Sequence, residues 1–264
     1  MGMITLLTDF GTQDEYVGVV KGVIIGINPK ARIVDITHGI PPQNVTTAAY
    51  TLLAAFPFFP RGTVHMAVVD PGVGTQRRII AASSDGHVFL APDNGLLRPV
   101  LRAFPPDEIY QVQNEDLFRH PVSRTFHGRD IFAPLAARFS LGLPMKASGR
   151  PMALSEVQDL TAQEPRLTSS GILEGYIVGV DRFGNLITNI SSEHLSGIGP
   201  GKLEIYAGDR KIGRLTDNYA QGYAEEPTAI IGSRNCLEIF VNGGSAAGVL
   251  RMGPGQVVHV KAGT

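Results

Sequence analysis

Short apolar runs alternate with segments of helical periodicity along the first half of the chain. Residues 4–7, 32–36 and 63–69 are apolar runs of the length expected for buried strands. After the first run, apolar residues recur three or four positions apart, at Val17, Val20, Ile24 and Ile27. A second helix is predicted to begin at Asn44 as its cap and to end before Pro57. Strands that alternate with helices favour a mostly parallel sheet.

Local signals add detail to this α/β domain, which we place at residues 1–147. Residues 12–15 have the sequence Thr-Gln-Asp-Glu, the form of a capping box at the start of the first helix. The pair Asp85 and Gly86 lies between two apolar runs and predicts a β-hairpin. Residues 95–104 and 130–139 are predicted to form two further helices.

The pattern changes after residue 147. Residues 148–170 are polar, contain Pro151 and Pro165, and are predicted to link two domains. Beyond them the chain has short β-rich runs separated by turn signals, at residues 172–180, 202–206, 228–231, 237–241 and 256–260. This spacing predicts a smaller all-β domain, a barrel or a sandwich, over residues 171–264.

Composition excludes several classes of protein. The 264 residues include 23 Lys plus Arg and 24 Asp plus Glu, so the net charge of -1 gives no electrostatic footprint for nucleic acid or an anionic membrane. The one cysteine, Cys236, cannot form an internal disulfide. The apolar stretch at residues 48–59 is about half the ~20 residues of a membrane-spanning helix. We therefore expect a soluble, cytoplasmic protein.

Polar residues at the predicted strand ends are the candidates for chemistry. Asp9 follows the first strand and Asp70 the third, so both should emerge at the carboxyl edge of the sheet, where α/β proteins bind ligands. Each could instead cap a turn or a helix. His127 directly precedes a predicted helix and is either structural or an acid/base group. Dinucleotide, P-loop and zinc-protease motifs are absent from the sequence.

The second half contributes groups suited to a planar or charged ligand. Phe183 could stack on a flat ring, and Asn185 offers an amide donor and acceptor. Arg234 offers a fork for a carboxylate or a phosphate. Tight turns with a core phenylalanine explain these residues equally well. The chain is rich in the two residues with special backbone conformations, 31 Gly and 18 Pro, and this excess fits loops that approach a small ligand closely.

Six segments in order make nearly the whole chain resemble the S-adenosyl-L-methionine (SAM) hydroxide adenosyltransferases, relatives of the SAM-dependent fluorinase and chlorinase. The segments are residues 8–11 with Asp14, 69–74 with Arg77 and Arg78, 91–97, 125–130, 183–185 with Thr188 and Asn189, and 233–235. The resemblance implies a homotrimer whose sites lie between one subunit's α/β domain and a neighbour's β domain. SAM would be the substrate, and neither a cofactor nor a metal is implied.

The resemblance also implies roles for individual residues. A catalytic triad would consist of Asp70, Arg77 and His127. Asp9 would hold the ribose hydroxyls, while Asp14 and Arg234 would hold the methionine amino and carboxylate groups. Adenine would be surrounded by Phe183, Asn185, Ser233, Glu238 and Val241.

Two departures from the halogenases favour water or hydroxide as the nucleophile. The halogenases carry Tyr at the position of Asp70, and the fluorinase carries Ser at the position of Gly128. An anionic Asp beside the nucleophile would repel halide. The expected reaction is therefore in-line attack of water on C5′ of SAM, which yields adenosine and L-methionine.

Three other interpretations stay open from the sequence. A halogenase would use the same substrate with chloride. A metal-dependent phosphohydrolase would use Asp9, Asp70 and His127 as ligands. A SAM or adenosine sensor would bind without turnover.

Overall fold

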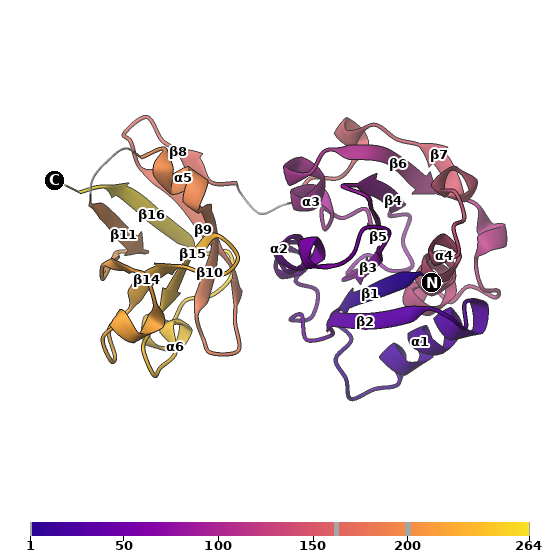
Figure 1. The fold of residues 1–264 in the computed structure, drawn as a ribbon, viewed down its shortest axis with the longest axis horizontal. Helices are drawn as coiled ribbons and strands as arrows, with labels where there is room; N and C mark the ends of the chain where they lie inside the picture. The colour runs from indigo at the N-terminus through magenta and orange to yellow at the C-terminus, as the bar shows by residue number, and fades with distance from the viewer. Residues whose placement is uncertain (1, 161–163, 199–201, 264) are drawn as a thin grey trace. The chain divides into compact units, whose positions relative to one another are not determined.

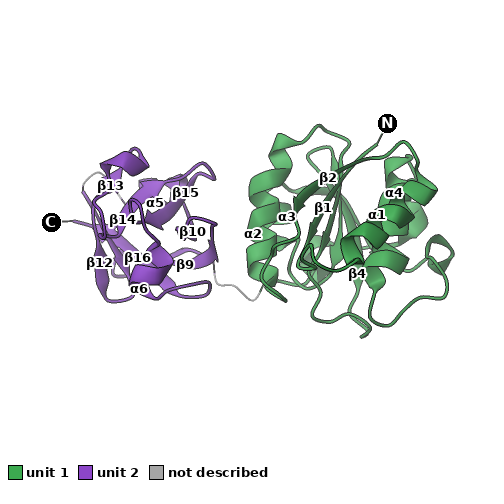
Figure 2. Cartoon of the chain, turned by 90° about the horizontal axis from the view of Figure 1, so that it is seen from below, with its two compact units in different colours: residues 1–161 green, residues 162–264 purple. Residues whose placement is uncertain are grey.

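The chain folds into two compact units. The computed structural model describes residues 2–160, 164–198 and 202–263. Unit 1 comprises residues 1–161 and unit 2 residues 162–264 (Figure 2). Each unit has its own sheet and its own hydrophobic core.

Unit 1 is built around a seven-stranded sheet in the order β2-β1-β3-β5-β4-β6-β7. Its elements are β1 (Met3–Thr8), α1 (Tyr16–Ile27), β2 (Arg32–Thr37), α2 (Val45–Ala55), β3 (Val64–Val68), β4 (Ile79–Ser84), β5 (His87–Pro92), α3 (Arg98–Ala103), β6 (Pro106–Val112), α4 (Ala133–Ser140) and β7 (Gly149–Pro151). The predicted apolar runs and helical segments correspond to these elements.

The mostly parallel sheet that the sequence favours is found only in part. Strands β2, β1, β3 and β5 pair in parallel, whereas the pairs β5–β4, β4–β6 and β6–β7 are antiparallel. The predicted hairpin is the reason. Asp85 and Gly86 both have positive φ, 47° and 75°, and join β4 to β5 in a two-residue turn. Such a turn can only connect antiparallel strands.

Helices cover both faces of this sheet (Figure 2). On one face, α1 and α4 bury Val20, Ile24 and Leu135 against Leu6 of β1. On the other face, α2 and α3 pack with the opposite side chains of the same strands. Side chains alternate between the two faces along a strand, so a run such as residues 4–7 contributes side chains to the cores on both faces of the sheet. This sandwiching explains why the strands are apolar on both faces.

Two predictions about helix starts have different outcomes. Asn44 caps α2 as predicted, because its Oδ1 accepts a hydrogen bond of 2.9 Å from the backbone N–H of Thr47. The capping box at residues 12–15 is wrong. Helix α1 begins at Tyr16, and its cap residue Glu15 makes no side-chain capping bond. Asp14 therefore lies before the helix and not in its first turn.

Much of the stretch predicted as a linker is structured. Strand β7 pairs with β6, and the backbone N–H of Gln158 donates to Asp93 at 2.8 Å, so these residues belong to unit 1. Strand β8 (Arg166–Leu167) pairs with β9 of unit 2. Residues 161–163 lie outside the described part of the chain.

Unit 2 consists mainly of β-strands, as predicted, with the two short helices α5 and α6. Nine strands form one curled sheet in the order β12-β11-β16-β9-β10-β15-β14-β13, with β8 beside β9 (Figure 1). Its remaining elements are β9 (Leu173–Val180), β10 (Leu186–Ser191), α5 (Ser192–Ser196), β11 (Leu203–Ala207), β12 (Arg210–Ile212), β13 (Leu215–Thr216), β14 (Thr228–Ile231), β15 (Cys236–Phe240), α6 (Ala246–Leu250) and β16 (Val257–Ala262). The described strands belong to a single sheet and not to a sandwich of two.

The apolar stretch at residues 48–59 forms α2 and a short 3-10 turn, η1 (Phe56–Phe58). Ala48, Ala49 and Leu52 are fully buried in the core of unit 1. None of the helices in the described residues has both the length and the apolarity needed to span a bilayer.

Candidate functional site

Unit 1 has a cavity of about 430 Å³ at the carboxyl ends of β1 and β3. Both Asp9 and Asp70 line it, as their positions after these strands predict. His127 lines the same cavity, together with the rings of Phe10, Tyr16 and Phe126. The centroids of the three rings lie 5.1 to 6.1 Å apart, and Phe126 packs edge to face against both Phe10 and Tyr16. The cavity thus combines acidic groups with an apolar wall.

Asp70 and Arg77 form a buried ion pair beside this cavity. Arg77 Nε donates to both carboxylate oxygens of Asp70, at 3.0 and 2.8 Å, and Nη2 donates to Oδ2 as well. Their side chains are 5% and 11% exposed, so water screens the pair weakly. Gly72 permits this close return of the chain, because a Cβ there would lie 3.2 Å from Arg77 Cγ.

His127 completes the cluster at the same Nη2 atom of Arg77 that donates to Asp70. Arg77 Nη2 lies 2.8 Å from His127 Nδ1. A guanidinium has donors only, so Nδ1 must be the acceptor and the neutral ring carries its proton on Nε2. Burial and the charge of Arg77 lower the pKa of His127, against the smaller opposing effect of Asp70 and Asp130. His127 is therefore a neutral Nε2–H donor at neutral pH.

A network of hydrogen bonds to Asp130 fixes the loop that carries His127. The Asp130 carboxylate is fully buried and accepts hydrogen bonds from Arg129, from Arg119 and from the backbone N–H of Ser123. The backbone of residues 128–132 forms a π-helical turn, η3, ahead of α4. Such turns are frequent at functional sites. Sequence reasoning missed the role of Asp130, although it named Asp130 as part of a motif.

The two acidic residues at the start of the chain differ in position. Asp9 Oδ2 accepts a hydrogen bond of 2.8 Å from the backbone N–H of Gln43, and the residue faces the cavity. Asp14 is exposed and is not among the residues that line the cavity, whereas its neighbour Glu15 is. The structure thus brings together four of the five predicted residues of unit 1: Asp9, Asp70, Arg77 and His127.

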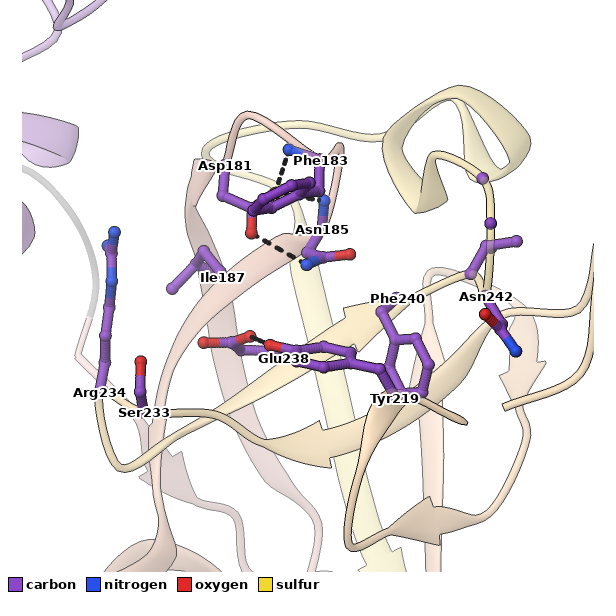
Figure 3. Close-up of a pocket in the computed structure, with 13 residues that line it drawn as sticks. Asp181, Phe183, Asn185, Ile187, Tyr219, Ser233, Arg234, Glu238, Phe240 and Asn242 are labelled. Carbon is purple, nitrogen blue, oxygen red and sulfur yellow. Dashed lines mark hydrogen bonds between the residues drawn. The ribbon is translucent and has the colours of Figure 1, made fainter. Parts of the chain in front are cut away.

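Unit 2 has a separate cavity of about 700 Å³, lined by residues from β10, β15 and the turns beside them (Figure 3). All six residues that the sequence analysis assigned to unit 2 line this cavity: Phe183, Asn185, Ser233, Arg234, Glu238 and Val241. Its lining also includes Phe240, together with Asp181 and Tyr219, to which sequence reasoning gave no role.

Asp181 shapes the turn that presents Phe183. Its Oδ1 accepts hydrogen bonds from the backbone N–H groups of Phe183 and Asn185, both at 2.9 Å, and its Oδ2 accepts one from Asn185 Nδ2 (Figure 3). This turn leaves the Phe183 side chain 77% exposed. The spacing of Asp181 before the turn is a typical Asx-turn signal, so the sequence did contain evidence for it.

Glu238 is a buried carboxyl on the floor of the second cavity. It is 4% exposed, and its Oε2 accepts a hydrogen bond of 3.0 Å from Tyr219 Oη. Burial raises the pKa of Glu238, while the bonds and charges of Tyr219 and Arg234 act in the opposite direction. Burial and the nearby Glu238 raise the pKa of Tyr219 to about 12. Gly232 leaves room for this group, since a Cβ there would have to displace the Glu238 carboxyl.

Comparison with known families identifies the chain. The family model described as SAM hydroxide adenosyltransferase N-terminal domain matches residues 4–149, and the one described as the C-terminal domain matches residues 175–259. The chain belongs to this family. The resemblance that the six sequence segments indicate is confirmed.

Individual members of the family are similar along nearly their whole length. A (R)-S-adenosyl-L-methionine hydrolase of Thermus thermophilus is 37% identical, over 98% of this chain and 100% of that protein. A fluorinase of Actinopolyspora mzabensis is 28% identical, over 98% and 96%. The crystal structure of an uncharacterized conserved protein from Thermotoga maritima superimposes with a TM-score of 0.89 at 36% identity, covering 98% of this chain and 100% of that one.

Proposed function

We propose that the protein hydrolyses SAM at the bond between C5′ and the sulfonium sulfur, giving adenosine and L-methionine. The observation that carries this proposal is the hydrogen-bonded cluster of Asp70, Arg77 and His127, in which Asp70 and His127 line the same cavity as Asp9. Family membership and the hydrolase relatives at 34–37% identity support it. The halogenase alternative is less favoured, because the Asp70 carboxylate that lines the cavity would repel a halide.

The leaving group sets what the site must supply. When a water oxygen attacks C5′ in line, the C5′–S bond breaks and its electron pair returns to sulfur, which leaves as a neutral thioether. No general acid is needed for that departure, and the reaction needs no metal ion. The site must instead orient the water, accept its proton and hold C5′ in line. Such alignment can be worth roughly 7–11 kcal/mol.

We propose that different residues carry out these tasks, and the hydrogen-bond geometry supports this division. His127 Nδ1 accepts a hydrogen bond from Arg77, so the neutral ring already carries its proton on Nε2. His127 therefore cannot accept a proton at Nε2 and instead donates Nε2–H to the oxygen of the water. Asp70 then accepts the proton of the water, and Arg77 fixes the carboxylate in place. Both oxygens of Asp70 accept hydrogen bonds from the Arg77 cation, which makes this carboxylate poorly placed to ligate a metal ion.

The name of the hydrolase relatives extends the proposal to the substrate's stereochemistry. In "(R)-S-adenosyl-L-methionine" the prefix L fixes the α-carbon, and the adenosyl group fixes the ribose, so (R) designates the sulfonium sulfur. We propose the same epimer as the substrate of this protein.

Turnover in ¹⁸O-water tests the reaction and the epimer together. The (R)-sulfonium epimer of SAM should yield equal amounts of methionine and of adenosine labelled at the 5′ oxygen, and the (S)-epimer should react more slowly. Tight binding without product would support the sensor alternative. A 5′-halo-adenosine formed with chloride would support the halogenase. Either result would contradict the proposed function.

We also propose a homotrimer in which a site combines unit 1 of one subunit with unit 2 of a neighbour. The division of labour between the cavities supports this, since unit 1 holds the acid/base groups and unit 2 the aromatic and amide groups. Arg234 of unit 2 would hold the methionine carboxylate, and the exposed Phe183 would stack on adenine.

Mixed oligomers test this arrangement. Asp70→Asn and Arg234→Glu should each lose most of the turnover when expressed alone, because each impairs one half of the site. Co-expression of the two variants should restore roughly a quarter of the sites, since some combine two intact halves from different chains. Light scattering measures the mass of the assembly. Mixed oligomers without activity, or a monomer with full activity, would rule out the shared site.

A further inference from the structure

Two loops at the mouth of the unit 1 cavity are joined by a buried histidine. They follow the neighbouring parallel strands β1 and β2. His38 Nδ1 lies 2.8 Å from Thr8 Oγ1, and the His38 carbonyl accepts a hydrogen bond of 2.8 Å from the backbone N–H of Gly11. Thr8 and His38 are 1% and 5% exposed. Residue 9 is thus enclosed by a side-chain bond on one side and a backbone bond on the other.

Asp35 lies beside the other ring nitrogen of His38. Its Nε2 lies 3.1 Å from Asp35 Oδ1, and Asp35 Oδ2 accepts a hydrogen bond of 2.6 Å from Lys21 on α1. Burial acts to raise the pKa of Asp35, but the opposing effects of Lys21 and His38 outweigh it and leave that pKa below its ordinary value. The imidazole is therefore hydrogen-bonded at Nδ1 to the end of β1, while its buried Nε2 faces the Asp35 carboxylate without making a hydrogen bond to any described residue.

The Asp9 carboxylate is oriented by the same pair of loops. Gln43, in the loop after β2, has a φ of 64° and directs its backbone N–H at Asp9 Oδ2. Within the described residues no donor contacts Oδ1 of Asp9, and Asp9 lines the cavity. One oxygen is thus committed to the protein, and the other is available to a ligand.

We propose that His38 is a positioning residue for Asp9. Through Thr8 Oγ1 and its own carbonyl it fixes the loop of residues 8–11, and so determines how strongly the protein prefers a ribose diol to a deoxy sugar. The inference rests on the proposed function, in which Asp9 binds the ribose hydroxyls. A loop that can tilt changes the angle at which the available oxygen of Asp9 meets the ribose hydroxyls, so the protein loses its preference for the diol before it loses all binding.

Strand β1 offers a matched pair of variants to test this. Thr8→Val removes the bond to His38. Thr5→Val removes an equivalent bond, because Thr5 is fully buried on the same strand and its Oγ1 lies 2.7 Å from His65 Nδ1. Calorimetry would give the ratio of the dissociation constants of 3′-deoxyadenosine and adenosine. Thr8→Val should lower this ratio by about tenfold, and Thr5→Val should leave it unchanged although both lose stability.

Variants of His38 separate positioning from mere packing. His38→Asn can place a polar atom near Nδ1 and should retain most of the preference for adenosine, whereas His38→Gln should lose it. If wild type prefers adenosine and Thr8→Val keeps that preference, the role of His38 is refuted while the proposed function stands. If wild type shows no preference for adenosine, the ribose site at Asp9 fails, and this inference fails with it.

Discussion

Replacing Asp70 with Asn is expected to lower the rate of SAM hydrolysis by about 10²–10⁴-fold, the usual contribution of a general base. Asparagine has nearly the same shape, but its amide cannot take the proton of the attacking water. The Arg77 guanidinium would also lose its counter-charge at a side chain that is only 5% exposed. Initial rates of adenosine formation at saturating SAM measure the loss, and calorimetry with adenosine shows whether binding survives.

The control for this variant is another buried carboxylate held by an arginine. Asp93 accepts a hydrogen bond of 2.7 Å from Arg78 Nε and is 7% exposed, but it lies outside the residues that line the cavity. Asp93→Asn should therefore reduce stability and leave the chemical step intact. Equal losses of rate in the two variants, with both proteins folded, would show that Asp70 acts through structure and not as the base.

The position of the catalytic edge could be predicted because it depends on local patterns. Apolar runs at residues 4–7 and 63–69 identify two buried strands, and strands of this kind are buried on both faces. Once β1 and β3 are parallel neighbours, Asp9 and Asp70 must emerge on the same side. The apolar content of the strands therefore places the two carboxylates before any side-chain contact is known.

The hydrogen-bond partners of the site could not be predicted in this way. His38 meets Thr8 across a separation of 30 residues, and Tyr219 meets Glu238 across 19. No periodicity links such residues, because their contact depends on how two loops pack after the strands have formed. The antiparallel half of the first sheet escapes the sequence for a different reason. The Asp85–Gly86 hairpin predicts one antiparallel pair, β4–β5, but the pairing of β4 with β6 joins segments that are distant in the sequence.

Acid should destabilise unit 1 through a buried histidine that the proposed chemistry does not use. Burial, and secondarily the charge of His87, lowers the pKa of His65 from 6.5 to about 3. The side chain is fully buried, with Nδ1 beside Thr5 Oγ1 and Nε2 3.1 Å from His87 Nδ1. Above pH 6.5 both the folded and the unfolded state hold a neutral ring, so this group leaves stability independent of pH there.

Between pH 6.5 and about 3 only the unfolded chain takes up the proton, so the free energy of unfolding decreases as the pH is lowered. At about 1.4 kcal/mol per pH unit, the loss from His65 reaches about 3 kcal/mol by pH 4. Urea unfolding followed by circular dichroism measures it, since the chain has no Trp. His65→Gln should unfold more readily at pH 7 but lose less stability between pH 7 and 4.

The exposed His120 provides the matched control, because His120→Gln removes a histidine that is already in contact with water. Its free energy of unfolding should follow that of wild type across the same range. If His65→Gln and wild type lose stability equally between pH 7 and 4, the ring of His65 takes up its proton in the folded state and the buried pair is not the acid-sensitive element. A smaller loss of unfolding free energy in His65→Gln, but not in His120→Gln, assigns the acid sensitivity to the buried histidine pair His65 and His87, and not to the carboxylates of the cavity.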